Sequence, residues 1–256
     1  MHFVTLITDF GTRDYYAGMV KGLIYKEVRD VTVVDVTHDI AAYDIVEAAY
    51  TLQQSYRSFP RGTIHLILVS NHENPDHALV FEHKGHWFVG PNNGMFSLCF
   101  DDIPKAVYRL DLQLKNLLAI RNKAGSAINQ IISGEFEQLE LLPERDYLQR
   151  LHLHPIVETS EIRGSVLLID HYGNAVLNIR RELFEYVRKG RDFEIYYKRN
   201  HPITHISEPD DDIEVDDIFC HFNDAGYLEL SVNMGNAAER YDLKREETVH
   251  IQFLEK

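Results

Sequence analysis

Apolar residues in the first half of the chain follow two alternating patterns. Short continuous apolar runs, typical of strands buried on both faces, occupy residues 3–8, 31–36 and 63–69. Between these runs, apolar residues recur at helical spacing. The repeats are Val20, Leu23, Ile24 and Val28 in the first segment, and Ile45, Ala48, Ala49 and Leu52 in the second. This order of strand and helix predicts parallel strand pairing with right-handed crossovers.

Local signals mark the ends of these elements. Asp44 and Glu47 form the spacing of a capping pair for the second helix, and the sequence FPRG at 59–62 ends it. Short strands are then predicted at 77–83, 86–90 and 106–110, with a turn at Gly85 that would leave His83 and His86 in solvent. A helix is predicted at 123–134, with one face made by Ala124, Ala127, Ile128 and Ile131. Residues 1–150 therefore read as an α/β domain.

The pattern changes after the polar connector at 143–154. Alternating apolar segments separated by turn residues follow, namely SVLLID, DFEIYY, IFCHFN, YLELSV and ETVHIQFL. The one convincing helix in this part is predicted at 181–188. Residues 157–256 therefore read as a small antiparallel β-domain.

The net charge and the lengths of the apolar runs limit the kinds of partner expected for this chain. The chain of 256 residues has 40 acidic and 26 basic side chains and a formal net charge of −14. This charge repels phosphodiester backbones and anionic membranes, so a small-molecule ligand is expected, with no nucleic-acid or membrane partner. No apolar run approaches the roughly 20 residues that span a bilayer, and a strand begins near Phe3, so a cytoplasmic protein without a signal peptide is expected.

Cysteines and histidines give little support for a metal site. Cys99 and Cys220 form no C-x-x-C pair, and we expect both to be small buried side chains. Four histidines cluster at positions 72, 77, 83 and 86, but their spacing fits no zinc motif, so metal binding is a minor hypothesis. The acidic run at 208–217 matches no EF-hand loop and is expected to be a solvated loop.

The segment LITDFGTRDYYAGMVKG places Asp9 directly after the first strand. Ligands of parallel sheets bind at the carboxyl ends of strands, and a carboxylate there can accept hydrogen bonds from both hydroxyls of a ribose. Asp14, at the start of the following helix, could either cap that helix or bind an ammonium group. The residues alone leave these alternatives open.

Six segments, taken together and in order, resemble one enzyme family. They are TDFGTRDYYAGMVKG, VVDVTHDI, FPRGTIHL, FVGPNNG, LLIDHYGNAVLNI and GYLELSVNMGNAAE. The chain resembles the S-adenosylmethionine (SAM) hydroxide adenosyltransferase family, which is kin to the fluorinase and chlorinase. The resemblance implies a Rossmann-like N-terminal α/β domain with a mostly parallel sheet, a smaller C-terminal antiparallel β-barrel, and a homotrimer. It also implies hydrolysis of SAM to adenosine and methionine without a cofactor.

The resemblance also assigns ligand contacts. Asp9 would hold the ribose hydroxyls, whereas Asp14 and Asp170 would face the ammonium group of the methionine moiety. Asn174, with Asn236 and the backbone of Ala237, would bind the adenine edge. An asparagine amide suits adenine because it offers a hydrogen-bond donor and an acceptor together.

The chain departs from the family pattern at the residues that would activate the attacking water by accepting its proton. Ser70 stands in place of the family's aspartate, His77 about in place of its arginine, and Ala119 in place of its histidine, although Arg121 survives. In addition, Asn92 replaces an aspartate, and Asp224 and Ala225 fall where a serine would grip the methionine carboxylate.

Two hypotheses follow from these departures. Either the chain is a hydrolase that handles the proton with new groups, with His77, Ser70 and Arg121 as the catalytic candidates, or it is a catalytically silent SAM- or adenosine-binding protein. The segment at 70–77 supplies histidines that could act as a general base if a carboxylate orients them. The same segment is also typical of a polar surface turn.

Overall fold

The computed structural model describes residues 1–69, 77–100, 102, 104, 106–111, 117–136, 139–150, 154–198 and 202–255, without the side chains of 117–122 and 145. The chain divides into two compact units, Met1–Arg150 and Leu151–Lys256. None of the helices in the described ranges has the length and apolarity needed to cross a bilayer.

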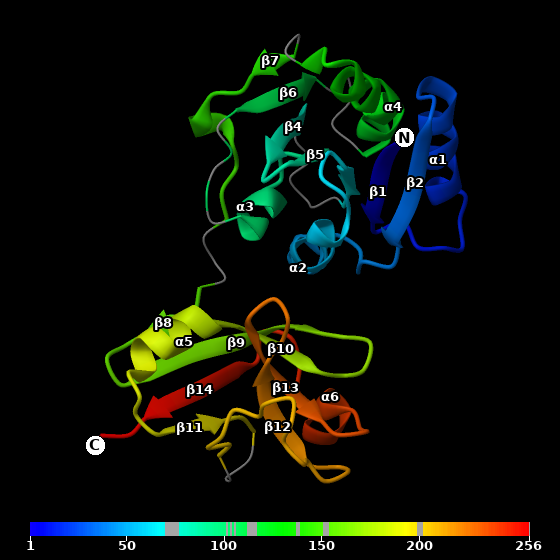
Figure 1. Ribbon diagram of the computed structural model, residues 1–256. Helices are drawn as coiled ribbons and strands as arrows, with labels where there is room; N and C mark the ends of the chain where they lie inside the picture. Colours follow the sequence, from blue (N-terminus) through cyan, green and yellow to red (C-terminus); the bar gives the residue numbers. More distant parts are fainter. Residues whose placement is uncertain are drawn as a thin grey trace. The chain divides into compact units, whose positions relative to one another are not determined.

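A seven-stranded sheet forms the centre of the first unit (Figure 1). Its strand order is β2-β1-β3-β5-β4-β6-β7. The bounds are β1 His2–Thr8, β2 Val31–Thr37, β3 Ile64–Leu68, β4 His77–His83, β5 His86–Pro91, β6 Val107–Asp111 and β7 Glu140–Leu141. The predicted apolar runs thus became β1, β2 and β3, which pair in parallel as expected.

The expectation of a mostly parallel sheet is wrong. The pairs β1–β2, β1–β3 and β3–β5 are parallel, whereas the pairs β4–β5, β4–β6 and β6–β7 are antiparallel. The cause is a two-residue turn between β4 and β5, where Lys84 and Gly85 both have positive φ angles of 52° and 86°. This geometry is typical of tight hairpins, and a hairpin makes its two strands antiparallel.

Helices cover both faces of this sheet (Figure 1). Helices α1 (Tyr16–Glu27) and α4 (Leu117–Ser133) pack on one face, and α2 (Ile45–Ser55) and α3 (Met95–Cys99) contribute to the core on the other. A short 3-10 helix, η1 (Tyr56–Ser58), follows α2, and another, η3 (Glu144–Asp146), follows β7. The predicted apolar face of α4 is confirmed, since Ala124, Ala127, Ile128 and Ile131 are all buried.

The predicted cap of α2 is also confirmed. The Asp44 carboxylate accepts hydrogen bonds from the amides of Val46 and Glu47. The Glu47 carboxylate reaches back to accept from the amide of Ala41 rather than that of Asp44. The polar pair therefore fixes the start of α2 and the chain that leads into it.

The second unit contains a curled antiparallel sheet of seven strands. The path runs β11-β14-β9-β10-β13-β12, and β8 pairs with β9. The bounds are β8 Ile156–Val157, β9 Glu161–Ile169, β10 Ala175–Arg180, β11 Phe193–Tyr196, β12 Ile218–Phe222, β13 Tyr227–Val232 and β14 Thr248–Phe253. Helices α5 (Arg181–Arg188) and α6 (Ala237–Tyr241) complete the unit. The predicted helix at 181–188 is confirmed as α5.

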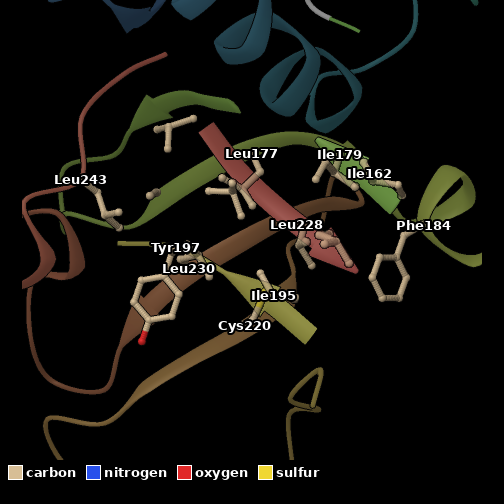
Figure 2. Close-up of a cluster of buried hydrophobic side chains, with 14 of the residues drawn as sticks. Ile162, Leu177, Ile179, Phe184, Ile195, Tyr197, Cys220, Leu228, Leu230 and Leu243 are labelled. Carbon is tan, nitrogen blue, oxygen red and sulfur yellow. The ribbon is translucent and has the colours of Figure 1, made fainter. Parts of the chain in front are cut away.

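One face of this sheet carries the core of the second unit (Figure 2). Alternate residues of β10 and β13, such as Leu177 and Leu228, meet Ile195 from β11. Phe184 from α5 is fully buried and packs edge-on against Phe193 at 5.1 Å between ring centroids. In β11 and β14 buried residues alternate with less buried ones, as expected of strands with one face on a core, whereas all six residues of β13 are buried. Both cysteines are buried, as expected, and burial raises the pKa of each thiol.

The expected exposure of His83 and His86 is wrong. Their side chains are only 7% and 4% exposed. Phe100 covers His83 at 4.5 Å between centroids, and Tyr56 packs edge-on against His86 at 5.3 Å. These aromatic rings come from segments distant in sequence, so the turn position alone did not predict the burial.

A buried hydrogen-bond chain crosses three strands of the first sheet. The Thr5 hydroxyl bonds His65 Nδ1 at 2.7 Å, and His65 Nε2 bonds His86 Nδ1 at 3.1 Å. Burial, together with a smaller contribution from the charge of His86, lowers the pKa of His65 from 6.5 to about 3. The network therefore holds His65 neutral.

This network predicts acid sensitivity. Because the pKa of His65 is depressed in the folded state, the unfolded state binds more protons below pH 6.5, and stability is lost as the pH falls from 6.5 toward 3. From pH 7 to pH 5 the expected loss due to His65 is about 2 kcal/mol, at roughly 1.4 kcal/mol per pH unit. Urea unfolding at the two pH values measures it.

The control variants are His65→Gln and His2→Gln. His65→Gln removes one of the buried histidines with a depressed pKa and should reduce the loss by the share due to His65, whereas His2→Gln changes an exposed histidine of the same sheet and should leave the loss intact. Equal unfolding free energies of the wild-type protein at pH 7 and pH 5 would contradict the prediction.

Candidate functional site

Three residues that the sequence analysis singled out lie at one edge of the sheet of the first unit. Parallel strands β1, β3 and β5 end at this edge, and antiparallel β4 begins there. Asp9 follows β1, Asn92 follows β5, and His77 is the first residue of β4. The carboxyl edge of a parallel sheet is where α/β proteins bind small ligands, because the loops there meet around the strand ends.

Asp9 is held by the loop that precedes α2. Its Oδ2 accepts a hydrogen bond from the amide of Tyr43 at 3.1 Å. Tyr43 has a φ angle of +70°, a left-handed conformation that is uncommon for a residue other than glycine. Asp14 is exposed, and Tyr15 is the N-cap residue of α1, with no side-chain cap bond. Capping therefore does not account for Asp14.

A polar chain that the sequence did not reveal fixes the backbone beside Asp9. The Thr8 hydroxyl bonds His38 Nδ1 at 2.9 Å, and His38 Nε2 lies 3.1 Å from the Asp35 carboxylate. Lys21 pairs with the same carboxylate at 2.5 Å, and the contacts of Lys21 and His38 outweigh burial to lower the pKa of Asp35. The only sequence signal was the spacing of Asp35 and His38 at the end of β2.

His77 and Asn92 are in direct contact. Asn92 Nδ2 lies 2.9 Å from His77 Nε2, and the two side chains are 2% and 8% exposed, in the order Asn92 and His77. Asn93, next in the chain, donates to the carbonyl of Val69 at 3.0 Å and so ties the end of β5 to the end of β3. Two residues that the sequence analysis set apart, His77 and Asn92, therefore touch each other.

Ser70 and the rest of 70–76 lie outside the described residues, as does the side chain of Arg121. This range includes His72, and the side chain of Ala119 is likewise outside the description. Among the side chains that the structure does describe, no group of three His, Cys, Asp or Glu residues could hold a metal ion.

In the second unit, the loop between β9 and β10 is built around Asp170. Its Oδ1 accepts from the amides of Tyr172 and Asn174 at 2.9 and 2.8 Å, and its Oδ2 accepts from the Asn174 side chain at 2.9 Å. Asp170 and Asn174 also bond through their backbones. The carboxylate therefore shapes the loop and orients the Asn174 amide.

A second loop meets this one at Gly173. The amide of Ala238 donates to the Gly173 carbonyl at 2.9 Å, and a Cβ at Gly173 would lie 2.0 Å from the Asn236 Oδ1. The Asn236 side chain caps α6 by accepting from the Glu239 amide at 2.8 Å. Asp170, Asn174, Asn236 and Ala237, all predicted ligand residues, are thus brought together by adjoining loops.

Removal of the Asp170 carboxylate should loosen the first loop. Asp170→Ala loses three hydrogen bonds, each worth about 0.5–1.5 kcal/mol net, so a destabilisation of about 2 kcal/mol is expected in urea unfolding. Asp192→Ala, at an exposed position of the same unit, is the control and should change stability little. Equal losses in the two variants would contradict a structural role for Asp170.

A separate hollow of about 480 Å³ lies in the second unit between the acidic run and β12. Apolar residues such as Ile203 and Phe219 line it together with Asp212, Glu214 and Asp217. No predicted site residue whose side chain the structure describes lines this hollow.

The first unit is an α/β unit with Asp9 at the carboxyl edge of its sheet. The second is a β unit in which two adjoining loops carry Asn174 and Asn236. The family model of the SAM hydroxide adenosyltransferase N-terminal domain matches residues 4–133. The model of the C-terminal domain of the same family matches residues 164–250. The chain belongs to the SAM hydroxide adenosyltransferase family.

Curated relatives match over nearly the whole chain. The (R)-S-adenosyl-L-methionine hydrolase of Methanocaldococcus jannaschii is 26% identical, covering 99% of this chain and 97% of that protein. The enzyme of the same name from Thermus thermophilus is 27% identical, with 95% and 97% covered. A fluorinase from Actinopolyspora mzabensis is 23% identical, with 97% and 96% covered.

Solved structures share the fold. An uncharacterised conserved protein from Thermotoga maritima superposes with a TM-score of 0.82 at 22% identity, covering 98% of this chain and 99% of the other. A conserved hypothetical protein from Thermus thermophilus gives a TM-score of 0.75 at 25% identity, with 99% and 100% covered.

Proposed function

We propose that this chain binds SAM and hydrolyses it to adenosine and methionine. The observation that carries the proposal is the end-to-end match to proteins named (R)-S-adenosyl-L-methionine hydrolase, together with family matches in both units. The homotrimer, the Rossmann-like and barrel descriptions and the absence of a cofactor are further parts of the proposal, and they rest on the resemblance. The cytoplasmic location is also part of the proposal, and it rests on the hydropathy of the sequence.

The reaction makes modest demands on the protein. The oxygen of water attacks C5′ of SAM, the bond between C5′ and sulfur breaks, and its electron pair stays on sulfur, which leaves neutral as the thioether of methionine. One proton is lost from the attacking water. A sulfonium needs no acid to leave, so the enzyme has to align water with the breaking bond and accept that proton.

We assign the ligand contacts to residues of both units. Asp9 would accept hydrogen bonds from the ribose hydroxyls, and a carboxylate has enough lone pairs to do so while it keeps the Tyr43 amide. Asn174, Asn236 and the Ala237 backbone would bind the adenine edge, and Asp14 and Asp170 would face the methionine ammonium group. The convergence of the Asn174 and Asn236 loops supports this assignment.

A silent nucleoside-binding protein is the second candidate. It is favoured by the contact of Asn92 with His77, because the partner of the Nε2 atom of this histidine is an amide that donates rather than a carboxylate. In the hydrolase, by contrast, Ser70 and Arg121 would be the proposed catalytic groups that remain beside His77.

The deciding experiment incubates the purified protein with SAM and follows adenosine and methionine by chromatography, with calorimetric titration of adenosine alongside. Equimolar adenosine and methionine above the spontaneous rate support hydrolysis. Adenosine binding without turnover supports the silent binder, and absence of both refutes the two candidates.

A further inference from the structure

The Asn92 side chain is oriented by two backbone groups. Its Nδ2 donates to the carbonyl of Asp146 at 2.7 Å, and its Oδ1 accepts from the amide of Leu148 at 3.0 Å. A carbonyl can only accept and an amide N–H can only donate. A flipped amide would therefore face two repulsive contacts, so its orientation is fixed.

This orientation determines which nitrogen of His77 carries the proton. Nδ2 of asparagine has two hydrogens, of which one goes to Asp146 and the other points at His77 Nε2, 2.9 Å away. A ring nitrogen that faces an N–H group must offer a lone pair. A neutral imidazole with an unprotonated Nε2 has its proton on Nδ1.

We infer that Asn92 is a positioning residue that holds His77 as a neutral imidazole protonated on Nδ1, with the Nε2 lone pair engaged. Both side chains are almost fully buried, so water competes poorly for this bond. A proton on Nε2 would place two N–H groups against each other. His77 therefore ties the start of β4 to residues 146–148 through Asn92, with Nε2 as the acceptor of the bond from Asn92.

For the proposed hydrolysis, and resting on that proposal, this inference has one chemical consequence. The proton lost from the attacking water goes to a group other than His77 Nε2. The same geometry holds without substrate, so it can be tested separately from turnover.

The test is nitrogen NMR of the full-length protein with ¹⁵N-labelled histidine, recorded without SAM at pH 7. Two-bond correlations from the ring carbon protons distinguish the two neutral tautomers and the doubly protonated ring. His77→Gln identifies the His77 signals by their loss. We expect the wild-type signals to show a proton on Nδ1 alone, whereas a proton on Nε2, alone or in addition, would overturn the inference.

The variant Asn92→Asp tests the role of Asn92, because it keeps the shape of the side chain and replaces the donor Nδ2 by an oxygen. A carboxylate can accept but not donate, so the His77 proton should move to Nε2, while the signals of His65 stay where they are. An unchanged His77 tautomer in this variant would overturn the role of Asn92. If the variant does not fold, the wild-type spectrum decides alone. A wild-type protein with the Nδ1 proton but no SAM turnover would refute the proposed hydrolysis and leave this inference standing.

Discussion

Asp9→Ala is expected to lower adenosine binding and SAM turnover together by at least about 100-fold. The variant loses the carboxylate that we assign to both ribose hydroxyls, and each hydrogen bond to a charged group contributes about 1.5–3 kcal/mol. The measurements are calorimetric titration with adenosine and the adenosine release assay. Asp39→Ala, which removes an exposed carboxylate from the neighbouring loop, is the control and should change neither.

A ligand change separates ribose binding from a structural role of Asp9, which also holds the Tyr43 amide. The wild-type protein should prefer adenosine over 2′,3′-dideoxyadenosine, because only adenosine has the two hydroxyls. Asp9→Ala should bind the two nucleosides equally. A variant that is weakened yet still prefers adenosine to the same degree would show that Asp9 acts through the loop and not on the ribose.

Gly173→Ala is expected to destabilise the second unit by about 3–4 kcal/mol. The φ angle of Gly173 is +83°, which costs a residue with a Cβ roughly 1–2 kcal/mol. The added Cβ would also lie 2.0 Å from Asn236 Oδ1. To relieve this clash Asn236 must turn away and give up its cap of α6, which costs about 1 kcal/mol, and the two loops must separate.

Urea unfolding of Gly173→Ala beside Gly190→Ala isolates the clash. Gly190 has a similar φ angle of +71° but open space around the position of a Cβ, so its variant should lose only about 1 kcal/mol. Asn236→Ala should partly rescue Gly173→Ala, because it removes the atoms in the way. Equal effects of the two glycine variants, or strictly additive effects of Gly173→Ala and Asn236→Ala, would contradict the predicted contact.

Local features of the fold could be predicted because their causes are local. Asp44 and Glu47 predicted the start of α2, and four apolar residues at helical spacing predicted the buried face of α4. The mixed sheet could not be predicted from periodicity, since alternation and apolar runs identify strands without their order. The burial of His86 depends on Tyr56, which reaches it only once the sheet and η1 are in place.

The candidate site shows the same division. The resemblance assigned Asp170 to the ammonium group of a ligand, whereas the structure shows that its carboxylate also closes a local turn with Asn174, four residues later. Its contact with Asn236 joins distant segments, and no local pattern encodes it. The contact of His77 with Asn92 had a usable signal, since counting outward from the two-residue turn at Lys84 and Gly85 places these residues opposite each other.

The hairpin has a consequence for how this chain could change its chemistry. Because β4 runs back along β5, the segment that joins β3 to β4 leaves and re-enters the sheet at the same edge. Substitutions, insertions or deletions between the end of β3 and the start of β4 can therefore change the reactive groups of the chain without shifting the register of any strand. Selection can thus alter the chemistry of this edge while the folding core stays constant.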